Sequence, residues 1–74
     1  MDNLSNAKKG IFYEVKGISP TANLKIKRRL LELGFTRGQK VKVVRKSLLG
    51  KAYLVEIRGF TLTVRRDIAG LVII

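Results

Sequence analysis

The side chains that could bind a metal ion or activate a nucleophile are few in this chain. It contains no cysteine and no histidine, so thiolate and imidazole ligands are absent. The hydroxyls of Ser47 and Thr61 therefore have no histidine to act as a general base. The carboxylates lie far apart in the sequence, at Asp2, Glu14, Glu32, Glu56 and Asp67. Because metal ligands must converge on one ion, we expect no metal site, no cofactor and no enzymatic activity.

The glycines do not form a phosphate-binding loop. Their spacing follows neither the GxxxxGKS nor the GxGxxG pattern, in which backbone amides surround a phosphate group. We expect Gly34, Gly38, Gly50 and Gly59 to serve turn geometry instead.

Positive charge is the strongest feature of the composition. Sixteen lysines and arginines against five acidic residues give a formal net charge of +11. This charge favours an anionic partner, which can be nucleic acid, an acidic protein surface or anionic lipid headgroups. Apolar residues make up 46% of the chain, which predicts a folded domain and not a disordered basic tail.

A chain of 74 residues predicts a single domain. Residues 1–9 are polar and lack the apolar segment of a signal peptide, so we expect a flexible polar leader followed by the domain in residues 10–74. The longest apolar stretch, Leu71 to Ile74, is too short to cross a bilayer. The expected location is the cytoplasm.

Apolar residues that alternate with polar ones predict most of the secondary structure. The segment from Gly10 to Gly17 predicts a half-buried strand, and three more strands follow at Lys40 to Lys46, Ala52 to Arg58 and Phe60 to Arg65. One helical turn is expected from Arg65 to Gly70, and a closing strand from Leu71 to Ile74. About five short strands indicate a small, partly open barrel, in which closure hides the strand edges.

One helix of about 12 residues is predicted between Thr21 and Leu33. The run Ser19-Pro20-Thr21 supplies candidate caps, and Gly34 is expected to end the helix in a left-handed conformation. A helical projection places one apolar stripe against the barrel, formed by Ala22, Ile26, Leu30 and Leu33.

A second apolar stripe lies on nearly the opposite side of this helix, at Leu24 and Leu31. It is either covered by another segment or forms a docking patch with a basic rim. Two more leucines occupy a loop tip where polar residues are usual, either as a lid on the barrel or as a second contact. The candidate partner-binding residues are therefore Leu24, Lys25, Arg28, Leu31, Leu48 and Leu49.

The stretch from Arg29 to Gly38, RLLELGFTRG, followed by Val41-Lys42-Val43, resembles the ferrous iron transport protein A (FeoA) family. The resemblance continues in order through the segments SLLG (47–50), VEIRG (55–59) and LTVR (62–65), and covers residues 17–74. It implies a mainly β fold with one helix, a small SH3-like barrel of about five strands. It also implies a cytosolic accessory protein, not an enzyme, that assists the membrane GTPase transporter for ferrous iron, FeoB.

The leading functional hypothesis is a regulatory module that binds FeoB by protein–protein contacts. Lys25 and Arg28 would orient it toward acidic patches or the anionic inner face of the membrane, and weak self-association is a further expectation. The alternative is a small barrel that binds RNA or DNA, which the charge supports. The aromatic residues oppose it, because most of them fall on core-facing positions and leave few rings for base stacking. A third hypothesis, a detached domain of an iron-dependent repressor, is opposed because no helix-turn-helix is predicted.

Overall fold

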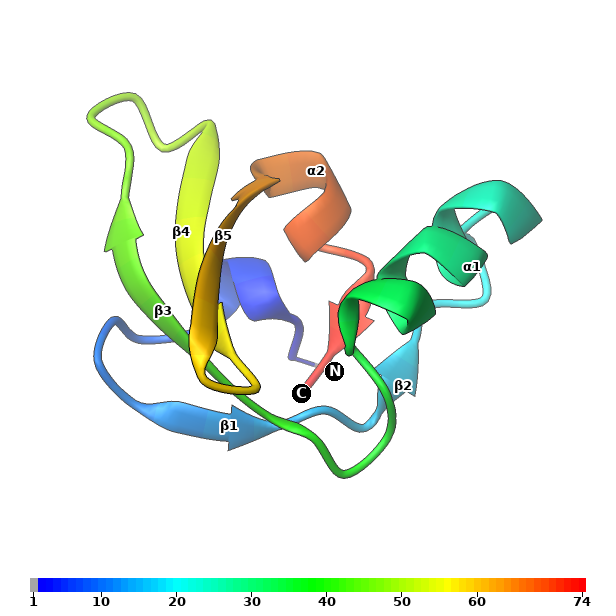
Figure 1. Ribbon diagram of the computed structural model, residues 1–74. Helices are drawn as coiled ribbons and strands as arrows, with labels where there is room; N and C mark the ends of the chain where they lie inside the picture. The colour runs from blue at the N-terminus through cyan, green and yellow to red at the C-terminus, as the bar shows by residue number, and fades with distance from the viewer. Residues whose placement is uncertain (1) are drawn as a thin grey trace.

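Two antiparallel sheets form the barrel in this computed structural model, which describes residues 2–74. The larger sheet has the strand order β1-β3-β4-β5, and β2 pairs with β6 in the smaller one. The strands are β1 (Phe12–Glu14), β2 (Gly17–Ile18), β3 (Lys40–Lys46), β4 (Ala52–Ile57), β5 (Phe60–Arg65) and β6 (Val72–Ile73). Figure 1 shows helix α1 (Leu24–Leu33) across from the curled large sheet, with the short α2 (Arg66–Ala69) above. No helix among residues 2–74 is long and apolar enough to span a membrane.

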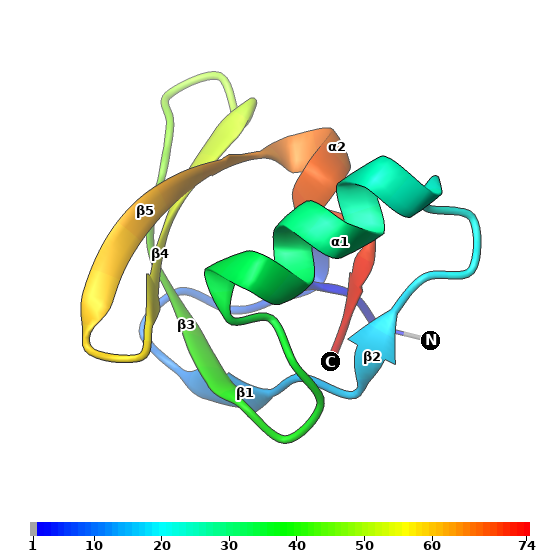
Figure 2. The ribbon, with the colours of Figure 1, turned by 45° about the vertical axis from the view of Figure 1, so that its right-hand side comes forward.

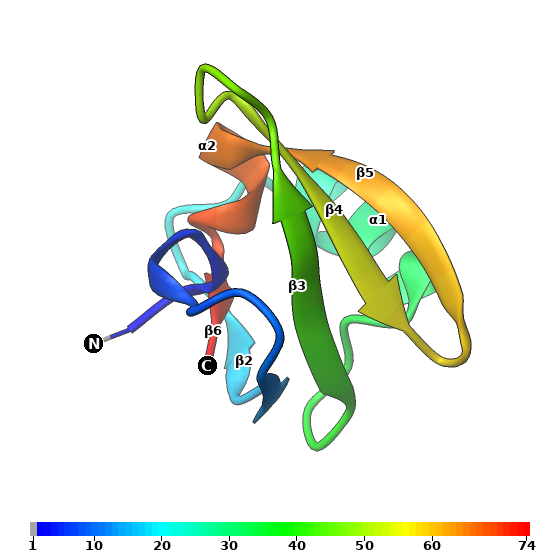
Figure 3. The same cartoon turned by 90° about the vertical axis from the view of Figure 1, so that its left-hand side faces the viewer.

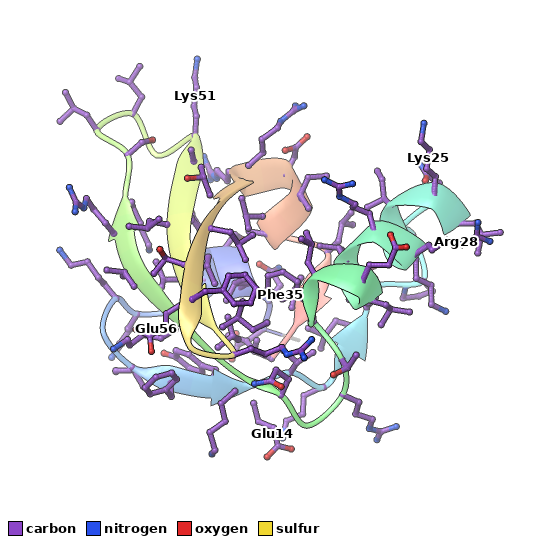
Figure 4. All side chains as sticks on the ribbon, in the orientation of Figure 1. Glu14, Lys25, Arg28, Phe35, Lys51 and Glu56 are labelled. Carbon is purple, nitrogen blue, oxygen red and sulfur yellow. The ribbon has the colours of Figure 1, made fainter. Side chains whose placement is uncertain are left out.

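Alternate residues of the central strands fill the core, as the sequence predicts. Val41 pairs with Ile57 and Val43 with Val55 across β3 and β4, so their side chains share the inner face of the sheet. Phe35 follows α1 and is fully buried in the middle of the barrel (Figure 4).

Helix α1 packs on this core through one side. Leu30 is its buried residue, and Ile26 and Leu33 pack beside it. The predicted core stripe of the helix is confirmed for these three residues.

The segment predicted as a polar leader, which the structure describes from residue 2, contributes Leu4 and Ala7 to this core. Residues Leu4–Asn6 form a short 3₁₀-helix, η1, and its Leu4 is fully buried, as is Ala7 one turn later. Residues three apart lie on the same side of a 3₁₀-helix, so both apolar side chains point inward. The Tyr53 hydroxyl donates a hydrogen bond of 3.1 Å to the Ser5 carbonyl and ties η1 to β4. The packed domain therefore includes residues before position 10.

The single strand predicted from Gly10 to Gly17 is two strands, β1 and β2. The change of sheet takes place between adjacent residues. The Val15 N–H donates to the Gln39 carbonyl at 2.8 Å, and the Lys16 N–H donates to the Ile73 carbonyl at 2.7 Å. The chain thus leaves the large sheet and joins β6, a pairing that local alternation does not reveal.

Helix α1 begins later than predicted. Its N-cap is Asn23, whose side chain accepts a hydrogen bond of 2.9 Å from the Ile26 N–H. The Ser19 and Thr21 hydroxyls instead bond to each other at 2.7 Å. The predicted helix end is confirmed, because Gly34 has φ 110° and its N–H bonds back to the last turn.

The predicted strand Ala52 to Arg58 ends one residue earlier, at Ile57. Arg58 and Gly59 have φ of 53° and 82° and form the two-residue turn between β4 and β5. Two central residues with positive φ match the twist of a tight hairpin. The two strands are therefore joined by a discrete tight turn.

Candidate partner-binding surfaces

The leucines on the outer face of α1 are uncovered. Leu24 is 68% exposed and Leu31 is 40% exposed. Neither the N-terminal segment nor the β3–β4 hairpin therefore covers them. An open depression runs along one flank of α1 from Leu24 and reaches the edge of the core stripe at Ile26; its lining is Leu24, Lys25, Ile26, Arg28, Arg29 and Glu32. Leu31 lies outside this lining. Figure 4 shows Lys25 and Arg28 extending away from the barrel at the free end of the helix.

Cations outnumber acids around Leu24, since Glu32 is the one acidic residue that lines the depression. Lys25, Lys27, Arg28 and Arg29 belong to α1, and the first turn of the helix contains no acidic residue. Among residues 2–74 the ion pairs within 4 Å involve none of these cations. The backbone dipole also places partial positive charge at this helix end, so an anionic group brought here would be stabilised. The geometry suits an apolar contact surrounded by acidic or otherwise anionic groups.

The β3–β4 hairpin presents a second apolar surface. Leu48 is 100% exposed and Leu49 is 75% exposed at its tip. They therefore do not cover the barrel as a lid, which was one of the two interpretations of the sequence. The Gly50 N–H donates to the Ser47 carbonyl at 2.9 Å and closes the turn that contains both leucines.

The two surfaces lie apart. In Figures 1 and 2 the hairpin tip projects from one end of the sheet, while α1 crosses the barrel on another side. Lys51 at the hairpin and Lys25 at the helix lie at opposite sides of the molecule in Figure 4. Of the six candidate residues, Leu24, Lys25 and Arg28 therefore share one site with Leu31 near it, and the hairpin leucines belong to another.

Exposed aromatic residues are a feature that the sequence analysis missed. Tyr13, Phe35 and Tyr53 contribute to the core, but Phe12 and Phe60 are about half exposed, at 48% and 47%. Phe12 and Glu14 are two residues apart on β1, so their side chains lie on the same outward face of the strand. This spacing could have indicated from the sequence that Phe12 is exposed. The Lys42 Nζ lies 4.7 Å from the centre of the Phe12 ring and 3.6 Å from Glu56 Oε1. A cation thus occupies one face of the ring on the outer surface of the sheet.

The carboxylates do not converge on a common point. Among residues 2–74 no group of three or more acidic side chains is placed to hold a metal ion. Glu14 and Asp67 are paired with Lys16 at 3.9 Å and Arg65 at 3.0 Å. The described surface thus offers apolar and cationic contacts, and no arrangement of oxygen ligands for ferrous iron.

Comparisons with known proteins give a consistent result. The family model for the FeoA domain matches residues 3–74. The solution structure of FeoA from Chlorobium tepidum is 38% identical, with a TM-score of 0.85, and the match covers 96% of this chain and 66% of that one. The crystal structure of Stenotrophomonas maltophilia FeoA complexed with zinc is 31% identical, with a TM-score of 0.85 and coverage of 99% and 88%. That relative is described as an SH3 domain protein proposed to act as a bacterial ferrous iron transport activating factor.

A more distant likeness concerns the fold alone. A manganese-dependent transcriptional repressor superimposes with a TM-score of 0.83 at 18% identity, over 96% of this chain and 39% of that chain. A search of curated proteins gave no match. The resemblance stated from the sequence and the predicted SH3-like barrel with one main helix are confirmed by the family model and the solved relatives.

Proposed function

Because the chain belongs to the FeoA family, we propose that it is a cytoplasmic accessory protein of ferrous iron uptake that binds the membrane transporter FeoB through the outer face of α1. The description of the Stenotrophomonas relative as a transport activating factor supports the link to iron transport. In this function the chain recognises a protein surface and performs no catalytic step of its own.

The observation that carries the proposal is the exposed Leu24 beside Lys25 and Arg28, neither of which forms an ion pair within the described residues. Protein interfaces commonly combine a small apolar centre, which supplies most of the affinity, with a charged rim. Full burial of a leucine side chain contributes about 1.5–3 kcal/mol. Lys25 and Arg28 would raise the association rate with an acidic patch and orient the two proteins.

Helix α1 is well suited to act as a docking element because it is held rigidly. The Asn23 side chain caps its start, the Gly34 N–H bonds to its last turn, and Leu30 anchors it in the core. A preformed surface loses little conformational entropy on binding, so more of the contact energy remains as affinity.

The test is co-elution with detergent-solubilised FeoB. We expect Leu24→Glu to weaken the complex by at least about tenfold, because a carboxylate would replace the apolar centre. The matched control is Ile11→Glu, which also converts an exposed apolar residue into glutamate and changes the net charge equally. Circular dichroism verifies the fold of both variants.

The basic rim is tested by a second pair of variants. Lys25→Glu/Arg28→Glu should weaken binding more at low salt than at high salt, since screening removes the attraction in the wild type. Lys8→Glu/Lys9→Glu makes the same charge change in two exposed residues away from α1. Undiminished binding by a folded Leu24→Glu variant would exclude the α1 face as the docking site.

A further inference from the structure

The tip of the β3–β4 hairpin exposes two leucines in a turn that holds them outward. Leu48 and Leu49 are the central residues of the turn from Ser47 to Gly50, and both are more exposed than Leu24. Figure 3 shows the hairpin projecting beyond the rest of the sheet. Nothing else among residues 2–74 packs on Leu48, which is fully exposed.

The backbone beneath this tip has its polar groups paired within the hairpin. The Ser47 hydroxyl accepts hydrogen bonds from the N–H groups of Lys51 and Ala52, at 3.0 and 3.1 Å. The Ser47 N–H donates to the Ala52 carbonyl at 2.8 Å. A polar group that leaves water without a partner is costly, and these groups would keep their partners in an apolar medium. The base of the hairpin can therefore approach an apolar medium at a smaller cost than an open loop could.

A collar of cations surrounds the base of the hairpin. Arg45 and Lys46 precede the tip and Lys51 follows it. The end of β5 adds two more, because Arg65 pairs with Ala52 in the ladder and the Arg66 N–H bonds to the Lys51 carbonyl at 2.9 Å. The collar therefore consists of Arg45, Lys46, Lys51, Arg65 and Arg66.

Acidic residues do little to offset this charge. The acid that lines the same surface is Asp67, which is already paired with Arg65. Glu14 and Glu56 lie in the opposite half of the molecule from Lys51 in Figure 4. If the tip leucines entered the acyl region, the collar would lie at the level of the lipid phosphates.

We propose that the β3–β4 hairpin inserts Leu48 and Leu49 into the surface of an anionic lipid bilayer, with the cation collar bound to the headgroups. Stable peripheral binding requires two signals, an apolar insertion and an electrostatic attraction, and the hairpin combines them at one end of the protein. Each lysine or arginine near an anionic surface strengthens binding by about fivefold. A nucleic acid would use the cations but would give the leucines no apolar environment. This contact does not depend on α1, and it would leave that face free for a protein.

The first test is cosedimentation with protein-free vesicles, either of phosphatidylglycerol mixed with phosphatidylcholine or of phosphatidylcholine alone. We expect wild-type protein to bind the anionic vesicles and Leu48→Ser to bind them at least about tenfold more weakly. Leu48→Ser preserves the net charge, so this loss would report insertion and not adsorption. Ile11→Ser, a matched change at a half-exposed residue, should bind like wild type.

The second test places a fluorophore at the tip. The chain contains no tryptophan, so Leu48→Trp and Ile11→Trp each supply a single reporter. Emission from position 48 should shift to the blue on anionic vesicles and be quenched by brominated lipid, while position 11 should show neither effect.

Unchanged emission at position 48, or equal vesicle binding by Leu48→Ser and the wild type, would overturn the proposal. Loss of FeoB binding by Leu48→Ser with vesicle binding intact would make the hairpin a protein contact instead. Because the vesicles contain no transporter, these results are independent of the test of α1.

Discussion

The side-chain stem of Arg58 lies directly over Gly34, so that a Cβ atom at position 34 would be 2.6 Å from Arg58 Cδ. Gly34 ends helix α1, and Arg58 belongs to the turn between β4 and β5. This contact joins the helix that carries the proposed FeoB surface to the large sheet. A side chain at position 34 would force the Arg58 side chain to move away.

We therefore expect Gly34→Ala to lower the free energy of unfolding by about 1–3 kcal/mol, measured by urea denaturation. One part of the loss comes from the backbone, because φ is 110°, and another from overlap with Arg58. Gly38→Ala separates the two parts, since φ is 91° there and no atom lies within 4 Å of the added Cβ. Equal losses in both variants would mean that the contact with Arg58 contributes nothing.

The N-terminal segment is expected to be essential for stability. Leu4→Ala should cost about 2–5 kcal/mol of unfolding free energy, because the side chain is fully buried among the core residues. Leu48→Ala removes the same atoms from a fully exposed side chain and should change stability by less than about 0.5 kcal/mol. Similar values for the two variants in thermal and urea unfolding would contradict the packing of η1.

The start of α1 can be tested by removing its cap. Asn23→Ala should destabilise the protein by about 1 kcal/mol, because the Ile26 N–H loses its side-chain acceptor. Thr21→Ala removes the cap expected from the sequence and should cost less, since the Thr21 hydroxyl bonds only to Ser19 in an exposed turn. A larger effect at position 21 would place the start of the helix earlier in the chain.

Binding to a random single-stranded oligonucleotide should be weaker than micromolar at physiological salt and should fall steeply as salt is added, because phosphate contacts dominate. Phe12→Ala should leave this binding unchanged, since Lys42 already covers one face of the ring. Fluorescence anisotropy measures both quantities. A submicromolar affinity that Phe12→Ala reduces about tenfold would favour the nucleic-acid alternative, as stacked bases contribute on that scale.

Local patterns in the sequence determined the central part of the fold. The alternation of Val41 and Val43 specifies which face of β3 is buried, because successive side chains of a strand point to opposite faces. Gly34 marks the end of α1, because that position requires a positive φ that glycine adopts without steric cost. The order of such features along the chain was also sufficient to state the family.

Other features depended on contacts between residues far apart in the chain. Three features depend on such contacts: the burial of Leu4, the division of the first strand at Val15 and the packing of Arg58 on Gly34. The periodicity of neighbouring residues does not reveal the distant partner in any of them. The sequence could also identify the two leucine pairs as candidate contacts. Only the tertiary structure decided that Leu24 and Leu48 are both uncovered and lie on separate surfaces, because exposure depends on what the rest of the chain packs against each side chain.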